Sequence, residues 1–193
     1  MNSISMSQKK ADTITGIPTP KMLLWISIVS MIMLFAGLTS GYIVRQAEGN
    51  WLLFDLPKIF LLSTILIMLS SISMQLALRS IKKGNNKTNL INLMITLGLG
   101  LGFCFTQFMG WSSMVDQGVF FVGNPSGSFL YVITGLHLAH LAGGIICLIV
   151  IITKSILERY DKENYMGISL TASYWHFLDI LWVYLFVFLS IMR

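Results

Sequence analysis

The sequence predicts an all-α integral membrane protein with five transmembrane helices. Of its 193 residues, 55% are hydrophobic and only 11% are charged, and the mean hydropathy is +0.76. This balance is typical of membrane proteins and leaves no room for a soluble domain. Five apolar stretches also reach the roughly 20 residues that span the hydrocarbon layer. We expect helices at about residues 22–45, 57–81, 89–115, 127–156 and 168–192.

The distribution of positive charge predicts the orientation of these helices. With five spans, the N-terminal tail and the second and fourth loops lie on one side of the membrane. Most of the 13 Lys and Arg residues fall on that side, which favours N-terminus inside and C-terminus outside. The net charge of +5 follows from this asymmetry, so no nucleic acid partner is needed. The first group holds Lys9, Lys10, Lys21, Arg79, Lys82, Lys83, Lys87, Lys154, Arg159 and Lys162, and the second holds Arg45, Lys58 and Arg193.

The first 20 residues are polar and contain no apolar segment of the kind found in a signal peptide. We therefore expect residues 1–20 to form a cytoplasmic tail and residues 21–193 to form a single five-helix transmembrane domain.

Asp179 lies near the middle of the last predicted helix, where a carboxylate is costly. An Asp at the centre of a spanning helix costs roughly 2.5 to 3.5 kcal/mol, so this side chain is expected to face protein, water or a bound group rather than lipid. Trp175, Asp179 and Trp182 follow at i, i+4 and i+7 and share one stripe. His176 precedes Asp179 by one turn, and we expect a hydrogen bond between these two side chains.

The ligand inventory limits the cofactors that the chain could hold. Its three histidines are His137, His140 and His176, too few for a haem-copper centre or for two bis-histidine haems. Cys104 and Cys147 lie inside predicted helices without Cys-x-x-Cys spacing, so neither a disulfide nor a thiolate metal site is indicated. We expect no catalytic residue, no metal and no cofactor in this chain. A membrane anchor with one bis-histidine haem stays open as an alternative, whereas a small transporter would need discontinuous helices or an ionisable pathway.

Small residues recur at one-turn spacing on three predicted helices. Such rows allow close packing of helices within this bundle, or contact with a partner subunit. The rows are Gly37 with Gly41, Gly98 with Gly102, and Gly135 with Ala139 and Gly143.

Two motifs in the last two predicted helices are specific. One is Tyr174-Trp175-His176-Phe177-Leu178-Asp179-Ile180-Leu181-Trp182, and the other is Thr134-Gly135-Leu136-His137-Leu138-Ala139-His140. Together they resemble the signature of cytochrome c oxidase subunit III, an accessory subunit of haem-copper oxidases. Further matches occur in the family's order along the chain: Phe35-Ala36-Gly37, Asp55-Leu56-Pro57, Leu69-Ser70-Ser71, and Gln107 with Trp111.

The resemblance covers about residues 21–193 and is to the short bacterial form with five helices. Three departures from the family pattern stand out. Many members have an acidic residue where this chain reads Val29-Ser30-Met31-Ile32, and many have a glutamate at the position of Gly110. Leu138 stands where a glycine is common. Roles that the family assigns to those carboxylates are therefore not carried over to this chain.

The resemblance implies an accessory, non-redox role in a proton-pumping terminal oxidase of the bacterial inner membrane. Partners would be subunit I, subunit II and phospholipids held between helices, with haem and copper in the partner subunits; membership of a respiratory supercomplex stays open. The resemblance favours cytochrome c as the electron donor, with a quinol oxidase as the alternative and a nitric oxide reductase as a further one. Candidate structural, lipid-facing or partner-facing residues are Gln107, Trp111, Gly135, His137, His140, Gly143, Tyr174, Trp175, His176, Asp179 and Trp182.

Overall fold

The computed structural model describes residues 19–192, and this range contains five α-helices and no strand. Each helix is long and apolar enough to cross a membrane, which confirms the predicted fold class. The predicted tail lies outside the described residues as far as residue 18, and the first helix already begins at Thr19. The helices are α2 (Thr19–Ala47), α3 (Ile59–Lys82), α4 (Asn86–Asp116), α5 (Pro125–Ile156) and α6 (Met166–Ile191).

The chain divides into two compact units at Gly37. The described part of the first unit is the N-terminal stretch of α2, residues 19–37. The second unit begins at Leu38 and contains the end of α2 together with α3, α4, α5 and α6.

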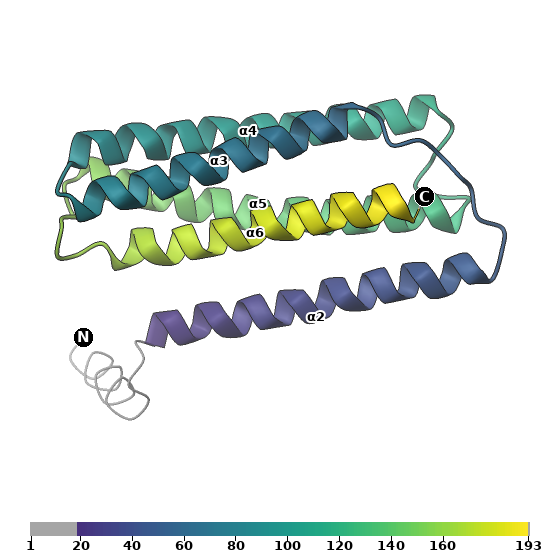
Figure 1. Ribbon diagram of the computed structural model, residues 1–193, viewed down its shortest axis with the longest axis horizontal. Helices are drawn as coiled ribbons and strands as arrows, with labels where there is room; N and C mark the ends of the chain where they lie inside the picture. The colour runs from purple at the N-terminus through teal and green to yellow at the C-terminus, as the bar shows by residue number, and fades with distance from the viewer. Residues whose placement is uncertain (1–18, 193) are drawn as a thin grey trace. The chain divides into compact units, whose positions relative to one another are not determined.

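The last four helices form a closed antiparallel ring. Contacts join α3 to α4, α4 to α5, α5 to α6, and α6 back to α3, and Figure 1 shows these four helices running side by side. The helices α3 and α5 are therefore diagonal to each other, as are α4 and α6. This up-down-up-down arrangement follows from short connections between consecutive helices.

Polar capping residues make α4 and α5 begin earlier in the chain than the apolar stretches from which the two helices were predicted. The Asn85 side chain accepts a hydrogen bond from the Thr88 backbone nitrogen at 3.1 Å, so α4 begins at Asn86 rather than at residue 89. The Asn124 side chain caps α5 in the same way, and Pro125 fills the first helical position. A hydropathy count cannot register these ends, because the residues that make them are polar.

The helix α3 begins at Ile59 rather than at the predicted residue 57. Pro57 stands just before the first turn and takes part through its carbonyl, which accepts from the Phe60 backbone nitrogen at 3.0 Å. The turn from α3 to α4 is short because Gly84 adopts a φ of 76°, in the left-handed region that glycine enters without steric cost.

Hydroxyl groups connect α3 to α4 inside the apolar layer. Ser63 Oγ donates to Thr106 Oγ1 at 2.9 Å, and Ser73 Oγ donates to the Asn92 carbonyl at 2.8 Å. Such interhelical hydrogen bonds stabilise membrane bundles, because lipid tails compete poorly for polar groups. The outward sides of the helices are apolar and exposed, as a lipid-facing or partner-facing surface requires.

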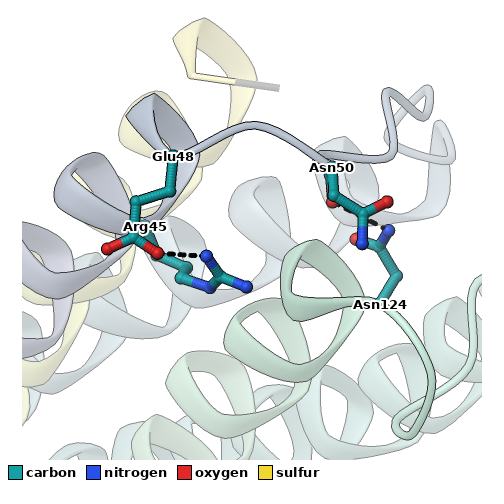
Figure 2. A network of polar contacts seen from close by, with 4 residues as sticks. All are labelled: Arg45, Glu48, Asn50 and Asn124. Atoms are coloured by element: carbon teal, nitrogen blue, oxygen red, sulfur yellow. Dashed lines mark hydrogen bonds and ion pairs between the residues drawn. The ribbon is translucent and has the colours of Figure 1, made fainter.

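Asn124 also joins the α2–α3 connection to the start of α5 (Figure 2). Its Oδ1 accepts from the backbone nitrogens of Leu52, at 3.3 Å, and Ser126, at 3.0 Å. Its Nδ2 donates to the Asn50 carbonyl at 3.2 Å. One side chain therefore holds a helix start and a loop that lies more than 70 positions earlier in the chain.

The end of α2 is joined to the end of α6. Gln46 Nε2 and the Tyr42 hydroxyl both donate to the Met192 carbonyl, at 2.8 and 3.2 Å. One turn deeper, the Tyr184 hydroxyl donates to Thr39 Oγ1 at 3.1 Å. Carbonyls at a helix C-terminus have no partner within the helix, so these side chains satisfy a group that the fold would otherwise leave to water.

Replacing Asn124 with Ala should destabilise the protein. The variant loses a helix cap and two contacts to the α2–α3 loop, and a cap alone contributes about 1 kcal/mol. The expected result is a lower thermal midpoint in detergent, together with faster proteolysis between residues 48 and 58. Asn86→Ala is the matched control, since Asn86 is exposed and the cap beside it is Asn85. Equal stability of the two variants would contradict this role of Asn124.

Candidate functional site

The stripe predicted on the last helix faces the interior of the four-helix ring. Trp175 and Trp182 are almost completely buried and Asp179 is 4% exposed, whereas the neighbouring Ile180 is 71% exposed. The helix α6 therefore directs its polar and aromatic stripe inward and an aliphatic face outward. This arrangement agrees with the cost of placing a carboxyl group in lipid.

Trp175 contacts all three of the other helices in the ring. Its indole nitrogen donates to Ser70 Oγ of α3 at 2.8 Å. Its ring lies against Gly100 of α4, where an added Cβ would come within 2.9 Å of the ring, and against Gly144 of α5, where the distance would be 3.4 Å. The two glycines leave the space that the indole fills.

Trp182 lies in an aromatic layer across the bundle. Its ring centroid is 4.9 Å from that of Phe103 on α4, 5.1 Å from that of His137 on α5, and 6.3 Å from that of Phe60 on α3. Its indole nitrogen donates to Thr64 Oγ1 at 3.0 Å. As with Trp175, an α6 tryptophan is positioned by a hydroxyl of α3.

Three buried side chains near this layer make no hydrogen bond in the structure. They are Gln107 on α4, His137 on α5 and Asp179 on α6, and none of their polar side-chain atoms has a partner. Gln107 and His137 are fully buried. In folded proteins most buried polar groups are paired with protein or with ordered water, so these three mark an unusual interior.

The predicted hydrogen bond between His176 and Asp179 is wrong. His176 Nδ1 is 2.6 Å from Ser71 Oγ, and its Nε2 is 3.2 Å from Gln75 Oε1, so both ring nitrogens are engaged with α3. The spacing i, i+3 does place His176 and Asp179 one turn apart, but the half-buried imidazole turns toward the hydroxyl and amide of the neighbouring helix.

An open groove of about 340 Å³ lies beside His176. It combines polar side chains with aliphatic ones, and the cationic group of Arg79 stands at its end near the α3–α4 turn. Its lining residues are Ser71, Ile72, Gln75, Leu76, Arg79 and His176.

The two histidines of α5 have different surroundings. His137 packs against the rings of Phe103 and Trp182, which also contact each other. His140 Nδ1 is 2.7 Å from the Leu136 carbonyl of its own helix, and the His140 carbonyl accepts from the Tyr174 hydroxyl at 3.1 Å. Within residues 19–192, no group of three His, Cys, Asp or Glu side chains is arranged to hold a metal ion.

The predicted rows of small residues are not where the closest packing occurs. A Cβ at Gly135 or Gly143 would be 3.9 Å from its nearest neighbour, which is ordinary contact, and a Cβ at Gly98 would meet nothing within 4 Å. Gly127 and Gly167 are tight against the loops that precede their own helices, and the tight positions between helices of the ring are Gly100, Gly110 and Gly144. Each of these faces an aromatic ring from another helix, so the small residues accommodate side chains rather than the backbone-to-backbone approach that the spacing suggested.

Gly110 explains one departure from the family pattern. A Cβ at this position would come within 3.0 Å of the Phe60 ring, so a larger side chain requires the Phe60 ring to move. Trp111, the next residue, donates from its indole nitrogen to Thr134 Oγ1 of α5 at 3.1 Å. In the sequence, Ser70 and Ser71 stand out only through their resemblance to the family. Their bonds to Trp175 and His176 are visible only in the structure.

These features define a class: a multi-pass α-helical membrane protein with a four-helix ring packed around buried tryptophans. A sequence profile of cytochrome c oxidase subunit III matches residues 52–192. The chain is 27% identical over 172 residues to a probable quinol oxidase subunit 3 of Staphylococcus saprophyticus, covering 86% of this chain and 85% of the relative. It is 29% identical over 181 residues to a probable cytochrome c oxidase subunit 3 of Nocardia farcinica, covering 89% and 86%.

A mammalian relative shows the difference in length within the family. The cytochrome c oxidase subunit 3 of Ornithorhynchus anatinus is 34% identical over 130 residues, which are 66% of this chain and 48% of that protein. The chain thus spans most of its bacterial relatives and about half of the mammalian one. It belongs to the cytochrome c oxidase subunit III family, and it is therefore a subunit III of a haem-copper terminal oxidase.

Replacing Gly100 with Ala should weaken the ring at Trp175. The new methyl group overlaps the indole, and overpacking of this kind costs typically 1 to 3 kcal/mol. Thermal unfolding of the purified protein in detergent measures the loss. Gly98→Ala on the same helix is the matched control, because its methyl group enters open space. Equal midpoints for the two variants would show that Trp175 does not need this space.

Asp179→Asn should leave folding stability within about 1 kcal/mol of the parent, because the carboxyl makes no hydrogen bond that the amide would lose. Trp175→Phe should lower stability more, since it leaves the buried Ser70 hydroxyl without its indole partner. Thermal midpoints of both variants decide the comparison. A larger loss for the Asn variant would assign Asp179 a structural role.

Proposed function

We propose that this chain is the non-redox subunit of its oxidase, and that it binds the catalytic subunit I while haem and copper reside in subunits I and II. The observation that carries the proposal is the use of its three histidines. His176 bonds to Ser71 and Gln75, His140 to its own helix, and His137 packs against two aromatic rings. Haem ligation would require two imidazole nitrogens directed at one iron atom.

The proposed role is mechanical support of subunit I and retention of phospholipid at its side. Two features support it. The interior of the ring is held by large buried tryptophans, whereas the outward faces of its helices carry exposed aliphatic and aromatic side chains. Such faces suit lipid tails or an apolar partner helix, since packing rather than hydrophobic burial drives association in membranes.

We propose cytochrome c as the electron donor, on the likeness of the motifs in the last two helices. Quinol is the second candidate, because relatives from Staphylococcus carry the name probable quinol oxidase subunit 3. Within this proposal the donor site lies on other chains, so the partner subunits decide between the two.

We also propose that the protein lies in the bacterial inner membrane with its N-terminus inside. The charge asymmetry of the loops supports this orientation. Lys82 and Lys83, at the turn between α3 and α4, would then face the cytoplasm, and Arg45, at the end of α2, would lie on the outer side.

Purification of the tagged protein from its native membrane tests the proposal. Mass spectrometry should identify a polytopic chain with haem-ligand histidines and a second partner chain. A pair of nearby cysteines in that second chain, as a binuclear copper site requires, would point to cytochrome c; a partner without them would point to quinol.

Two results would contradict the proposal. One is the recovery of a flavin or iron-sulfur dehydrogenase in place of an oxidase. The other is a haem absorption band that this chain shows when it is produced alone, and that is lost when a histidine such as His137 or His176 is replaced with Ala. The parent chain alone should show no such band.

A further inference from the structure

The open groove of about 340 Å³ that α3 and α6 line changes in character along its length. Arg79, Gln75 and Ser71 line it at steps of four residues on α3, so they follow one another at intervals of about one helical turn, starting near the α3–α4 turn. Ile72 and Leu76, both exposed, form its aliphatic side. The groove is therefore charged at its end, polar one turn further in, and aliphatic along one side.

Arg79 brings to this groove a positive charge that no carboxylate of the described chain neutralises. The single ion pair among residues 19–192 joins Arg45 to Glu48. Arg45 lines another open groove, of about 370 Å³, at the start of α5, where its charge is already compensated. The two grooves therefore differ in whether their arginine is available to an external anion, with which a guanidinium forms strong, charge-assisted hydrogen bonds.

The end of the bundle around Arg79 carries an excess of positive charge. Basic residues outnumber acidic ones in the α3–α4 and α5–α6 connections and in the helix turns beside them. Such an excess attracts a headgroup with a net negative charge and repels the cationic group of a zwitterionic headgroup. The basic residues are Arg79, Lys82, Lys83, Lys87, Lys154, Arg159 and Lys162, and the acidic residues are Glu158, Asp161 and Glu163.

Gln75 offers hydrogen-bond donors one turn further into the groove than Arg79. Its Oε1 lies 3.2 Å from His176 Nε2, and because an amide oxygen only accepts, the ring nitrogen is the donor. The other ring nitrogen, Nδ1, then accepts from the Ser71 hydroxyl at 2.6 Å. These bonds leave the two N–H donors of the Gln75 amide for an acceptor in the groove.

The order of these groups matches the order of groups along a phospholipid. The phosphate of a phospholipid lies at the membrane surface, the ester carbonyls lie a short distance below it, and the acyl chains follow. Gln75 lies four residues from Arg79, or roughly 6 Å along the helix at about 1.5 Å per residue. A basic pocket between transmembrane helices near the membrane surface is a typical site for an anionic headgroup.

We propose that this groove binds one phospholipid with a net negative headgroup. The phosphate pairs with Arg79, and an ester carbonyl accepts from Gln75 Nε2. An acyl chain lies along Ile72 and Leu76. The proposal rests on the retention of phospholipid proposed above and adds its site and its lipid class. With the N-terminus inside, the lipid belongs to the cytoplasmic leaflet.

Native mass spectrometry of the intact oxidase tests this site. The complex in mild detergent is titrated with chain-deuterated phosphatidylglycerol, and with phosphatidylcholine of the same acyl chains for comparison. Arg79→Gln should weaken the binding of one phosphatidylglycerol about fivefold, the contribution expected of one basic side chain, and leave phosphatidylcholine binding unchanged. Arg79→Lys, which keeps the charge, should bind as the parent does. Arg45→Gln is the matched control, since that arginine is already paired with Glu48.

Three results would overturn the proposal. Phosphatidylglycerol binding at the parent affinity in Arg79→Gln would show that the groove is not the site. An equal loss of both lipids would show that the net charge of the headgroup is not recognised. Displacement of the bound lipid by glycerol 3-phosphate would show that the acyl chain contributes nothing. The retention of phospholipid as such fails only if the parent oxidase binds neither lipid, so the two failures are distinguishable.

Discussion

The four-helix ring depends on the insertion of Trp175 between its neighbours. Lipid offers helices no hydrophobic reason to associate, so they must gain close packing and hydrogen bonds from one another. Trp175 supplies both, because its ring fills the space left by Gly100 and Gly144 while its nitrogen bonds to Ser70. One side chain of α6 thereby contacts α3, α4 and α5. The positions of Asp179 and Trp182 follow, since they continue the same face of α6 by one and two turns.

The helix α3 supplies the polar counterpart of that face. Thr64 and Ser70 accept from the two tryptophans of α6, Ser71 pairs with His176, and Ser63 and Ser73 donate to α4. These hydroxyls place polar groups inside the membrane-spanning part of α3 without the desolvation cost of a charge. They also hold α3 against two neighbours at once, so a serine or threonine of α3 is less replaceable than its small size suggests.

Five helices and the inward direction of the Trp175 stripe could be predicted from the sequence, because length, hydropathy and helical period determine them. The helix starts at Asn86 and Pro125 could not, since capping depends on single polar side chains. The partner of His176 was also missed: spacing within α6 identifies Asp179 as a neighbour, but says nothing about which residues of α3 lie closer. The tight glycines were missed for the same reason, because the rings that they face come from other helices.

The bond between Gln46 and the Met192 carbonyl spans 146 positions of the chain. Its consequence concerns biogenesis. The helix α2 leaves the ribosome first among the described helices and α6 leaves last, so this contact cannot form until every span has been synthesised. The end of α2 must wait in the translocon or in lipid while four further helices are added. Closure of the second unit is therefore a late event. An oxidase partner that bound α2 during synthesis would meet the end of this helix before α6 had formed its contact with it.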